Sequence, residues 1–340
     1  MHPEHIIGCF HIQGTPVSTE PFDHGHINST FKLTTDAGRA YILQHINKYV
    51  FKNPPQLMMN ASRGTNFIRE KGALALRFIE AKNGTYCLQD EEDEYWRCYE
   101  FVEGFCMDAP ETDEDFYQSA LAFGQFQNQL SDFPAETLYE TIPNFHNTKS
   151  RYANFLAALE RNASGRAHLV QDEIQFITDR AEKCSLIVDA LADGSLPLRV
   201  THNDTKLNNV MLDPKTGEGV CVIDLDTVMP GYSVNDFGDS IRFGANTAAE
   251  DETDLSKVSL DIELFKTYAE GFLKGCNGKL TKAEIELLPI GAIMMTLECG
   301  MRFLTDYLDG DVYFRTSRPG HNLDRCRCQF ALVADMERKL

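Results

Sequence analysis

Two stretches in the second half of the chain constrain its fold more than any other feature. Residues 200–212 read VTHNDTKLNNVML, and residues 220–226 read VCVIDLD. In both stretches polar residues lie between β-branched and apolar residues of the kind that favour strands. The first stretch therefore predicts a loop that enters a strand, and the second predicts a carboxylate at a strand end. A hairpin of these two strands would bring Asn209 close to Asp224.

The polar side chains of these stretches are the ones that phosphoryl transfer requires. The Asp204 carboxylate can orient an attacking hydroxyl and accept its proton. The amide oxygen of Asn209 and the carboxylate of Asp224 are hard ligands, which suit magnesium bound to the phosphates of ATP and argue against zinc or copper. The alternative is that these are ordinary turn-forming residues. His202 and Asp204 alone would be weak evidence, but the complete set favours a magnesium- and ATP-dependent kinase.

The same residues resemble the signature of a known superfamily. His202, Asp204 and Asn209, in the spacing HxDxxxxN and followed by an Ile-Asp pair at 223–224, are similar to the motif of the aminoglycoside phosphotransferases and choline kinases. Further segments narrow the resemblance to the N-acetylhexosamine 1-kinases, and it covers nearly the whole chain. These segments are 41–44 (YILQ), 50–51 (VF), 202–209 (HNDTKLNN), 236–243 (DFGDSIRF) and 302–307 (RFLTDY).

The resemblance implies roles for individual residues. Asp204 would be the catalytic base, and Asn209 and Asp224 would be the metal ligands. His202 would brace the catalytic loop rather than transfer a proton. Two further acids, Asp236 and Asp239, are expected to have a structural role in the helix after the hairpin. For Asp226, support of the metal ligands and an ordinary place at a strand end stay open as alternatives.

The fold that the resemblance implies is α+β, with the two lobes of a protein kinase. Residues 1–103 are expected to form a β-rich nucleotide-binding lobe. Residues 104–340 are expected to form a mainly helical lobe that holds the catalytic β-hairpin and binds the acceptor. Thr281 and Glu284 form a capping-box pattern, which predicts a long helix from there to about residue 308. Strands are expected at 31–34, 39–45, 86–88 and 95–102, with an acidic hairpin loop at 90–94, and helices within 57–81 and at 116–130, 152–159, 173–191 and 323–338.

The nucleotide side of the site is predicted from a polar turn and from the lobe junction. Gly25 permits close approach of backbone to phosphate, and the hydroxyls of Ser29 and Thr30 can donate to phosphate oxygens. Without the Asp204 motif the same turn would be merely a polar hairpin. Adenine is expected to lie against the strand that contains Glu100 and Val102, using its backbone groups.

Gln44 departs from the usual kinase pattern. Kinases of this fold usually carry a lysine in the third strand, which holds the α- and β-phosphates. Glutamine can donate a hydrogen bond but brings no charge. His45, Lys32 or magnesium could compensate, and the sequence does not choose among them. The usual lysine–glutamate ion pair is therefore not expected, and Glu70 is not assigned to it.

The acceptor site is also predicted from the resemblance. Phe243, Arg302 and Tyr313 match positions that line the sugar site of N-acetylhexosamine 1-kinases. An arginine can fork onto neighbouring hydroxyls, and an aromatic ring can cover the sugar or its acetamido methyl group. The alternative for Phe243 is an ordinary core aromatic. The alternative for Arg302 is a structural ion pair with Asp306 or another acid, because a buried charge needs a partner.

Composition excludes several classes of partner. The formal net charge of −19 disfavours nucleic acid and anionic membrane surfaces. No uninterrupted apolar run approaches the roughly 20 residues needed to span a bilayer. Residues 1–10 do not have the pattern of a signal peptide, and the ten cysteines are scattered, as in a reducing compartment. We therefore expect a cytoplasmic protein with a small-molecule partner, of undetermined oligomeric state.

The sequence favours a kinase that phosphorylates the 1-hydroxyl of N-acetylhexosamines. The first alternative is a kinase of another small alcohol, such as an aminoglycoside, choline or homoserine. Choline needs an aromatic cage, and the single tryptophan, Trp96, lies in the first lobe. Aminoglycosides suit an acidic protein, but Arg302, Arg315 and Arg318 crowd the predicted pocket. The second alternative is a nucleotide-binding module without turnover, which the missing lysine favours and the complete acidic set opposes.

Overall fold

The computed structural model describes residues 3–22 and 27–340, and the chain divides into two compact units. Unit 1 comprises Met1–Cys106, Gln129–Pro143 and Asn209–Pro230, and unit 2 comprises Met107–Asn128, Asn144–Asn208 and Gly231–Leu340. The predicted α+β class is confirmed, because strands dominate unit 1 and helices dominate unit 2. Each unit is built from three separate segments of the chain. The sequence predicted one boundary between the two lobes, at residue 103, and this boundary stays a prediction.

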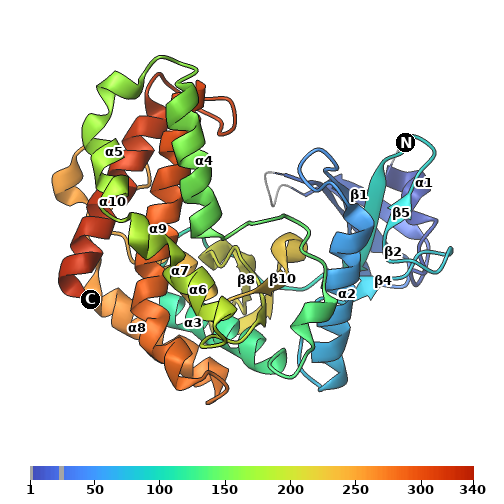
Figure 1. Cartoon of the computed structure of the whole chain (residues 1–340). Coiled ribbons are helices and arrows are strands. Elements are labelled where there is room, and N and C mark those ends of the chain that lie inside the picture. Colours follow the sequence, from blue (N-terminus) through green and yellow to red (C-terminus); the bar gives the residue numbers. More distant parts are fainter. Residues whose placement is uncertain (1–2, 23–26) are drawn as a thin grey trace. The chain divides into compact units, whose positions relative to one another are not determined.

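Unit 1 contains an antiparallel sheet whose strand order is β1-β2-β3-β6-β4, with β5 also paired to β6 (Figure 1). The strands are β1 (Pro16–Pro21), β2 (Ser29–Thr35), β3 (Ala40–Ile46), β4 (Phe78–Ile79), β5 (Leu88–Gln89) and β6 (Tyr95–Glu100). The acidic loop predicted at 90–94 joins β5 to β6, as expected. The predicted strands at 31–34 and 39–45 lie within one residue or two of β2 and β3, because both segments contain several β-branched and aromatic residues.

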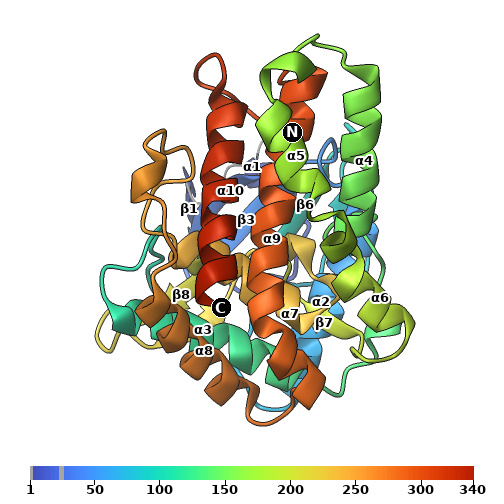
Figure 2. The same ribbon diagram turned by 60° about the vertical axis from the view of Figure 1, so that its left-hand side comes forward.

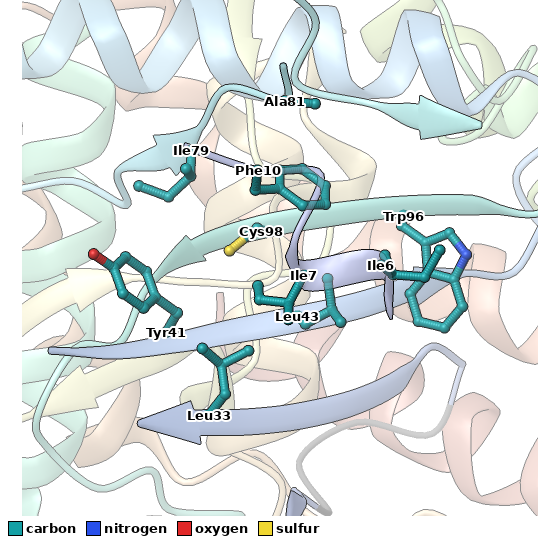
Figure 3. Packing of buried hydrophobic residues seen from close by; sticks show 10 residues of the cluster. All are labelled: Ile6, Ile7, Phe10, Leu33, Tyr41, Leu43, Ile79, Ala81, Trp96 and Cys98. Atoms are coloured by element: carbon teal, nitrogen blue, oxygen red, sulfur yellow. The ribbon is translucent and has the colours of Figure 1, made fainter. Parts of the chain in front are cut away.

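One face of this sheet is covered by an apolar cluster (Figure 3). Leu33 of β2, Leu43 of β3 and Cys98 of β6 lie on this face and are fully buried. The short helix α1 (Pro3–Ile7) adds Ile6 and Ile7 to the same cluster. Sequence periodicity did not predict α1, which has only five residues, or β1, whose sequence PVSTEP contains few apolar residues.

The helix α2 ends earlier than predicted. It runs from Pro54 to Glu70 and does not continue to residue 81, because Gly72 follows in a left-handed conformation and Phe78 belongs to β4. Two prolines, Pro54 and Pro55, begin the helix. Proline is tolerated in the first helical turn because the N–H it lacks has no partner there.

Unit 2 consists mainly of helices. They are α3 (Asp113–Gln129), α4 (Thr148–Arg161), α5 (Gln171–Thr178), α6 (Leu186–Ala192), α7 (Ser233–Gly244), α8 (Ile262–Cys276), α9 (Lys282–Asp309) and α10 (His321–Lys339). The single helix predicted at 173–191 is in fact α5, a 3-10 turn at Ala181–Ser185, and α6. Sequence periodicity also missed α8.

The long helix α9 forms the core of unit 2, beside α10, α4 and α7 (Figure 2). It begins with the predicted capping box of Thr281 and Glu284. The approach to α7 is close, since a Cβ at Gly238 would lie 2.4 Å from the carbonyl oxygen of Gly291. Among the described residues α9 is long and apolar enough to cross a membrane by length and composition alone, but most of its apolar stretch is buried within the structure.

Candidate active site

The loop that carries Asp204 follows β7 (Arg199–Thr201) and is held by the first turns of α7. The buried carboxylate of Asp236 accepts hydrogen bonds from the backbone N–H of His202 at 2.9 Å and of Asn203 at 2.8 Å. Gln127 of α3 donates a third hydrogen bond to the same carboxylate, at 2.7 Å. Burial raises the pKa of Asp236, and these donors oppose the rise. Asp236 therefore fixes the backbone immediately before Asp204.

Asp239, one turn later in α7, holds the residue after Asp204. Its carboxylate accepts from the backbone N–H of Thr205 at 3.1 Å and pairs with Arg242 at 3.0 Å. Burial would raise the pKa of Asp239, but the charges of Arg242, His146 and Lys206 together lower it. The hydroxyl of Ser240 donates to the carbonyl oxygen of Thr205 at 2.6 Å. The predicted structural role of Asp236 and Asp239 is thus confirmed, and what they hold is the loop.

His202 lies fully buried beneath this loop. Its ring packs against the rings of Phe123 and Phe126 at centroid distances of 5.4 and 6.0 Å. Its Nδ1 accepts a hydrogen bond from the backbone N–H of Asp204 at 3.3 Å. These contacts agree with the bracing role that the resemblance implied.

The Asp204 side chain is half-buried and pairs with a lysine of its own loop. Lys206 Nζ lies 2.9 Å from Asp204 Oδ1. Burial would lower the pKa of Lys206, but the charges of Asp204 and Asp239 outweigh burial and raise it. Lys206 is therefore a cation beside the Asp204 carboxylate.

The predicted hairpin is present in unit 1. Strands β8 (Val210–Leu212) and β9 (Gly219–Val222) pair antiparallel, and the N–H of Ile223 donates to the carbonyl oxygen of Asn209 at 2.9 Å. Asn209 is therefore held directly beside the residue that precedes Asp224. Asp224 itself is exposed and has a left-handed backbone with φ of 54°.

Asp226 lies two residues after Asp224 but is buried. It forms an ion pair with the equally buried Arg97 of β6, whose side chain is 4% exposed. Asn28 Nδ2 donates to the other carboxylate oxygen of Asp226 at 2.6 Å. Arg97 and Asn28 thus hold the buried Asp226 carboxylate, and its support of the metal ligands stays a prediction.

Gln44 is the cross-strand neighbour of Arg97. Arg97 Nε donates to Gln44 Oε1 at 2.8 Å, and Gln44 Nε2 donates to Thr30 Oγ1 at 3.0 Å. The two side chains that the sequence offered as substitutes for the missing lysine, Lys32 and His45, have other partners. Lys32 Nζ lies 3.7 Å from the ring centroid of Phe101, and His45 pairs with Glu94 at 2.8 Å. The charge beside Gln44 is that of Arg97.

The other predicted nucleotide residues are placed only in part. Gly25 lies outside the described residues. Ser29 is exposed at the start of β2, and the next residue, Thr30, is buried. Glu100 ends β6 and pairs with Arg77 at 3.2 Å, while the half-buried Val102 follows the strand.

On the acceptor side, the structure rules out Asp306 as the partner of Arg302. The Asp306 carboxylate accepts from the backbone N–H groups of Val312, Tyr313 and Phe314 at 2.8–2.9 Å, and so shapes the loop after α9. Arg302 is half-buried, and in residues 3–22 and 27–340 it forms no ion pair with any acid. Its guanidinium lies 5.3 Å from the ring centroid of Phe314.

Tyr313 packs on the same ring as Arg302. The centroids of Tyr313 and Phe314 lie 4.8 Å apart, and Tyr313 is 74% exposed. Phe243 is half-buried in the last turn of α7, which packs against α9. Unit 2 therefore brings Arg302 and Tyr313 together, and Phe243 lies on the helix packed beside α9.

Residues 18–261 match the model of the phosphotransferase enzyme family. The chain belongs to this family.

Solved structures of low identity share the fold of this phosphotransferase. An aminoglycoside phosphotransferase from Alicyclobacillus acidocaldarius is 15% identical with a TM-score of 0.66, and the match covers 100% of this chain and 96% of that one. An amicoumacin kinase is 12% identical with a TM-score of 0.65, covering 99% and 94%. A microcompartment-associated aminopropanol kinase is 16% identical with a TM-score of 0.61, covering 98% and 95%.

The phosphotransferase also has polar residues near Arg302 that sequence reasoning missed. His146 Nδ1 lies 3.0 Å from Glu298 Oε1, and His146 Nε2 lies 2.9 Å from the carbonyl oxygen of Asn203. Both partners are acceptors, so both ring nitrogens donate and His146 is an imidazolium. Burial would lower the pKa of His146, but the charges of Glu298 and Asp239 and the hydrogen bonds to Glu298 and Asn203 together raise it. Glu298, one helical turn before Arg302, is thus linked to the loop of Asp204.

Arg151 of α4 is a further charged residue near Glu298 and Arg302. Burial lowers the pKa of Arg151, Glu298 raises it, and the charge of Arg302 lowers it further. Glu298 Oε2 and Arg151 Nε are buried, and neither has a hydrogen-bond partner among the residues that the structure describes. Such groups are rare in native proteins and call for an explanation such as a bound ligand. No sequence signal marks Arg151 or His146, since each lies outside the recognised motifs.

Proposed function

We propose that this phosphotransferase uses ATP and magnesium to phosphorylate the anomeric hydroxyl of N-acetylglucosamine or N-acetylgalactosamine, giving the sugar 1-phosphate. The observation that carries the choice of acceptor is Arg302. It is a half-buried guanidinium without a carboxylate partner in the described part of the chain, and it lies beside the aromatic loop of Tyr313. A neutral, hydroxyl-rich acceptor can supply the hydrogen-bond acceptors that this guanidinium lacks.

The catalytic roles follow from the chemistry of the loop. Asp204 orients the sugar 1-hydroxyl and accepts its proton, while Asp236 and Asp239 hold the loop in place. The anomeric hydroxyl is more acidic than an ordinary alcohol, which eases this proton transfer. Lys206 Nζ pairs with this carboxylate in the resting protein.

The hairpin supplies ligands that fit magnesium. Asn209 and Asp224 offer one amide oxygen and one exposed carboxylate. In the described residues no group of three or more His, Cys, Asp or Glu side chains could hold a metal by itself. Magnesium is usually bound by one or two protein oxygens together with water and substrate phosphates, and it would neutralise charge on the transferring phosphoryl group. The amicoumacin kinase of similar fold is in complex with AMP-PNP and Ca²⁺, which supports the use of a nucleotide with a divalent ion.

For the nucleotide we propose the residues that the sequence indicated. Gly25, Ser29 and Thr30 would lie near the phosphates together with Gln44. The backbone of Glu100 and Val102 would hold the adenine. Thr30 and Gln44 are already hydrogen-bonded to each other, so their part is to order this side of the sheet.

The charged side chains around Arg302 disfavour cationic acceptors. Arg302, Arg151 and His146 carry three positive charges, and Glu298 carries one negative charge. Choline and aminoglycosides are cations, which this arrangement would repel. A neutral N-acetylhexosamine meets no such repulsion, and Phe243 and Tyr313 offer aromatic surface for its ring or acetamido methyl group.

The test is the Arg302→Ala variant. Loss of a hydrogen bond to a charged group costs about 2 kcal/mol, so the KM for the sugar should rise roughly thirtyfold. The KM for ATP should barely change. Arg161→Ala is the matched control, because Arg161 belongs to the exposed pair with Asp309 in the same unit. If the folded Arg302→Ala enzyme has the sugar kinetics of the wild type, the proposed pocket is wrong.

A further inference from the structure

Three polar side chains form a row across neighbouring strands of unit 1. The register pairs Thr30 of β2 with Gln44 of β3, and Gln44 with Arg97 of β6. Side chains of directly paired residues lie on the same face of a sheet. This face is opposite to the apolar cluster, because Leu43 and Cys98 are the next residues along their strands. All three row residues are buried.

Arg97 is the only charged member of the row. Its Nε bonds to Gln44, and its Nη1 pairs with Asp226. Nη1 also lies 3.8 Å from the sulfur of Met58 in α2, which covers this part of the face. Burial by itself would lower the pKa of the Arg97 guanidinium, but Asp226 outweighs burial and raises it. A buried arginine of this kind is a permanent cation held by one carboxylate.

The same carboxylate is bonded to the segment that precedes β2. Asn28 Nδ2 donates to Asp226, and the Oδ1 of Asn28 accepts from the N–H of Asn47 at 2.9 Å. The hydroxyl of Thr30 lies 3.5 Å from the carbonyl oxygen of Asn28. Asp226 therefore connects segment 28–30, the row on the sheet and the end of the catalytic hairpin within unit 1.

The ion pair between Arg97 and Asp226 also distinguishes Asp226 from the neighbouring acid, Asp224. Asp226 is buried and neutralised by Arg97, whereas Asp224 is exposed. The charge of Asp224 still acts on both Arg97 and Tyr99, so it lies within electrostatic range of this face. Removing either partner of the pair would break the link between β6 and the end of the hairpin, and Asp224, two residues from Asp226, would lose its fixed position.

We propose that Arg97 supplies, from β6, the positive charge that the strand of Gln44 lacks, and that its ion pair with Asp226 positions Asp224 and segment 28–30 for the magnesium nucleotide. Arg97 and Asp226 are positioning residues, which act through Asp224 and through the row. The inference rests on the proposed use of ATP and magnesium, and it does not depend on which alcohol is phosphorylated.

The experiment measures binding of magnesium AMP-PNP without any acceptor, by calorimetry, for Arg97→Met, Arg97→Lys and Asp226→Asn. Loss of a residue that orients a metal ligand typically weakens metal binding 10- to 100-fold, so we expect nucleotide affinity to fall roughly tenfold or more in Arg97→Met. Arg97→Lys keeps the charge and should recover part of the affinity. In steady-state assays the KM for ATP should rise while the KM for the acceptor stays the same.

The matched control is Arg180→Gln, which breaks a two-pronged pair with Glu337 in unit 2. It should lower thermal stability without changing nucleotide affinity. If Arg97→Met does not fold, Asp226→Asn decides the question, because asparagine has nearly the same volume as aspartate. Wild-type affinity in a folded Arg97→Met or Asp226→Asn variant would overturn the inference, as would equal losses for both substrates. Failure of the sugar proposal would look different, with intact nucleotide binding and no phosphorylated N-acetylhexosamine.

Discussion

At the scale of single residues, one leucine separates two acids with different surroundings. Asp224 has a left-handed backbone and is exposed, and Asp226 is buried against Arg97. The sequence identified Asp224 as the candidate ligand by its motif, but it could not assign Asp226. The sequence does not indicate Arg97, because an arginine inside a strand is unremarkable until the register places it beside Gln44. Cross-strand partners are a product of tertiary structure and cannot be deduced from one strand alone.

Asp204 gives the sharpest prediction at this scale. The Asp204→Asn variant keeps the size of the side chain and its place in the loop, but it cannot accept the proton. Turnover should fall by about 10³-fold, the usual contribution of a general base, while affinity for magnesium AMP-PNP persists. Asp213→Asn, at the exposed turn of the hairpin, is the matched control and should leave turnover unchanged. Near-normal turnover in Asp204→Asn would remove this residue from the mechanism.

At the scale of elements, local signals decided which predictions held. The start of α9 was predicted correctly because its capping box is a local motif. The helix within 57–81 was predicted too long, because apolar spacing continued past the point where Gly72 ends α2. The break between α5 and α6 was missed because the apolar residues on either side keep a near-helical spacing.

The link between α9 and the catalytic loop gives a prediction about pH. His146 bridges Glu298 of α9 and Asn203, and its pKa is raised above the ordinary value of 6.5. Since the folded-state pKa exceeds the unfolded one, the stabilisation is fully present below pH 6.5 and is lost as pH rises through the folded value. The difference in unfolding free energy between wild type and His146→Gln should therefore shrink as the pH rises from 6.5 through the folded-state pKa of His146.

Two measurements check this prediction. Urea unfolding across the pH range gives the free-energy difference, and NMR titration of the His146 ring gives its pKa directly. His168, which is exposed and bonded only to a carbonyl of its own turn, serves as the reference histidine. A ring of His146 that loses its proton below pH 6.5 would contradict the imidazolium bridge.

At the scale of the whole molecule, the kinase-like fold could be predicted because its motifs occur in a fixed order along the chain. The family match across residues 18–261 confirms the phosphotransferase assignment. The residues proposed to surround the acceptor were only partly predictable from the sequence. Arg151 lies on α4, Arg302 lies on α9, and His146 lies in a loop. His146 and Arg151 could be identified only from the structure, because packing brings them near Arg302. The sequence indicated Arg302 and Tyr313 because they lie in recognisable segments.

The central claim is the transfer of phosphate from ATP to the 1-hydroxyl of an N-acetylhexosamine. The most direct test incubates the protein with ATP, magnesium and one acceptor at a time, and follows the products by phosphorus NMR. The panel contains N-acetylglucosamine, N-acetylgalactosamine, choline, an aminoglycoside and homoserine. We predict ADP together with a sugar phosphate whose phosphorus couples to the anomeric proton, for one or both N-acetylhexosamines and for no cationic acceptor. Phosphate on another hydroxyl of the sugar, or on one of the other alcohols alone, would contradict the account.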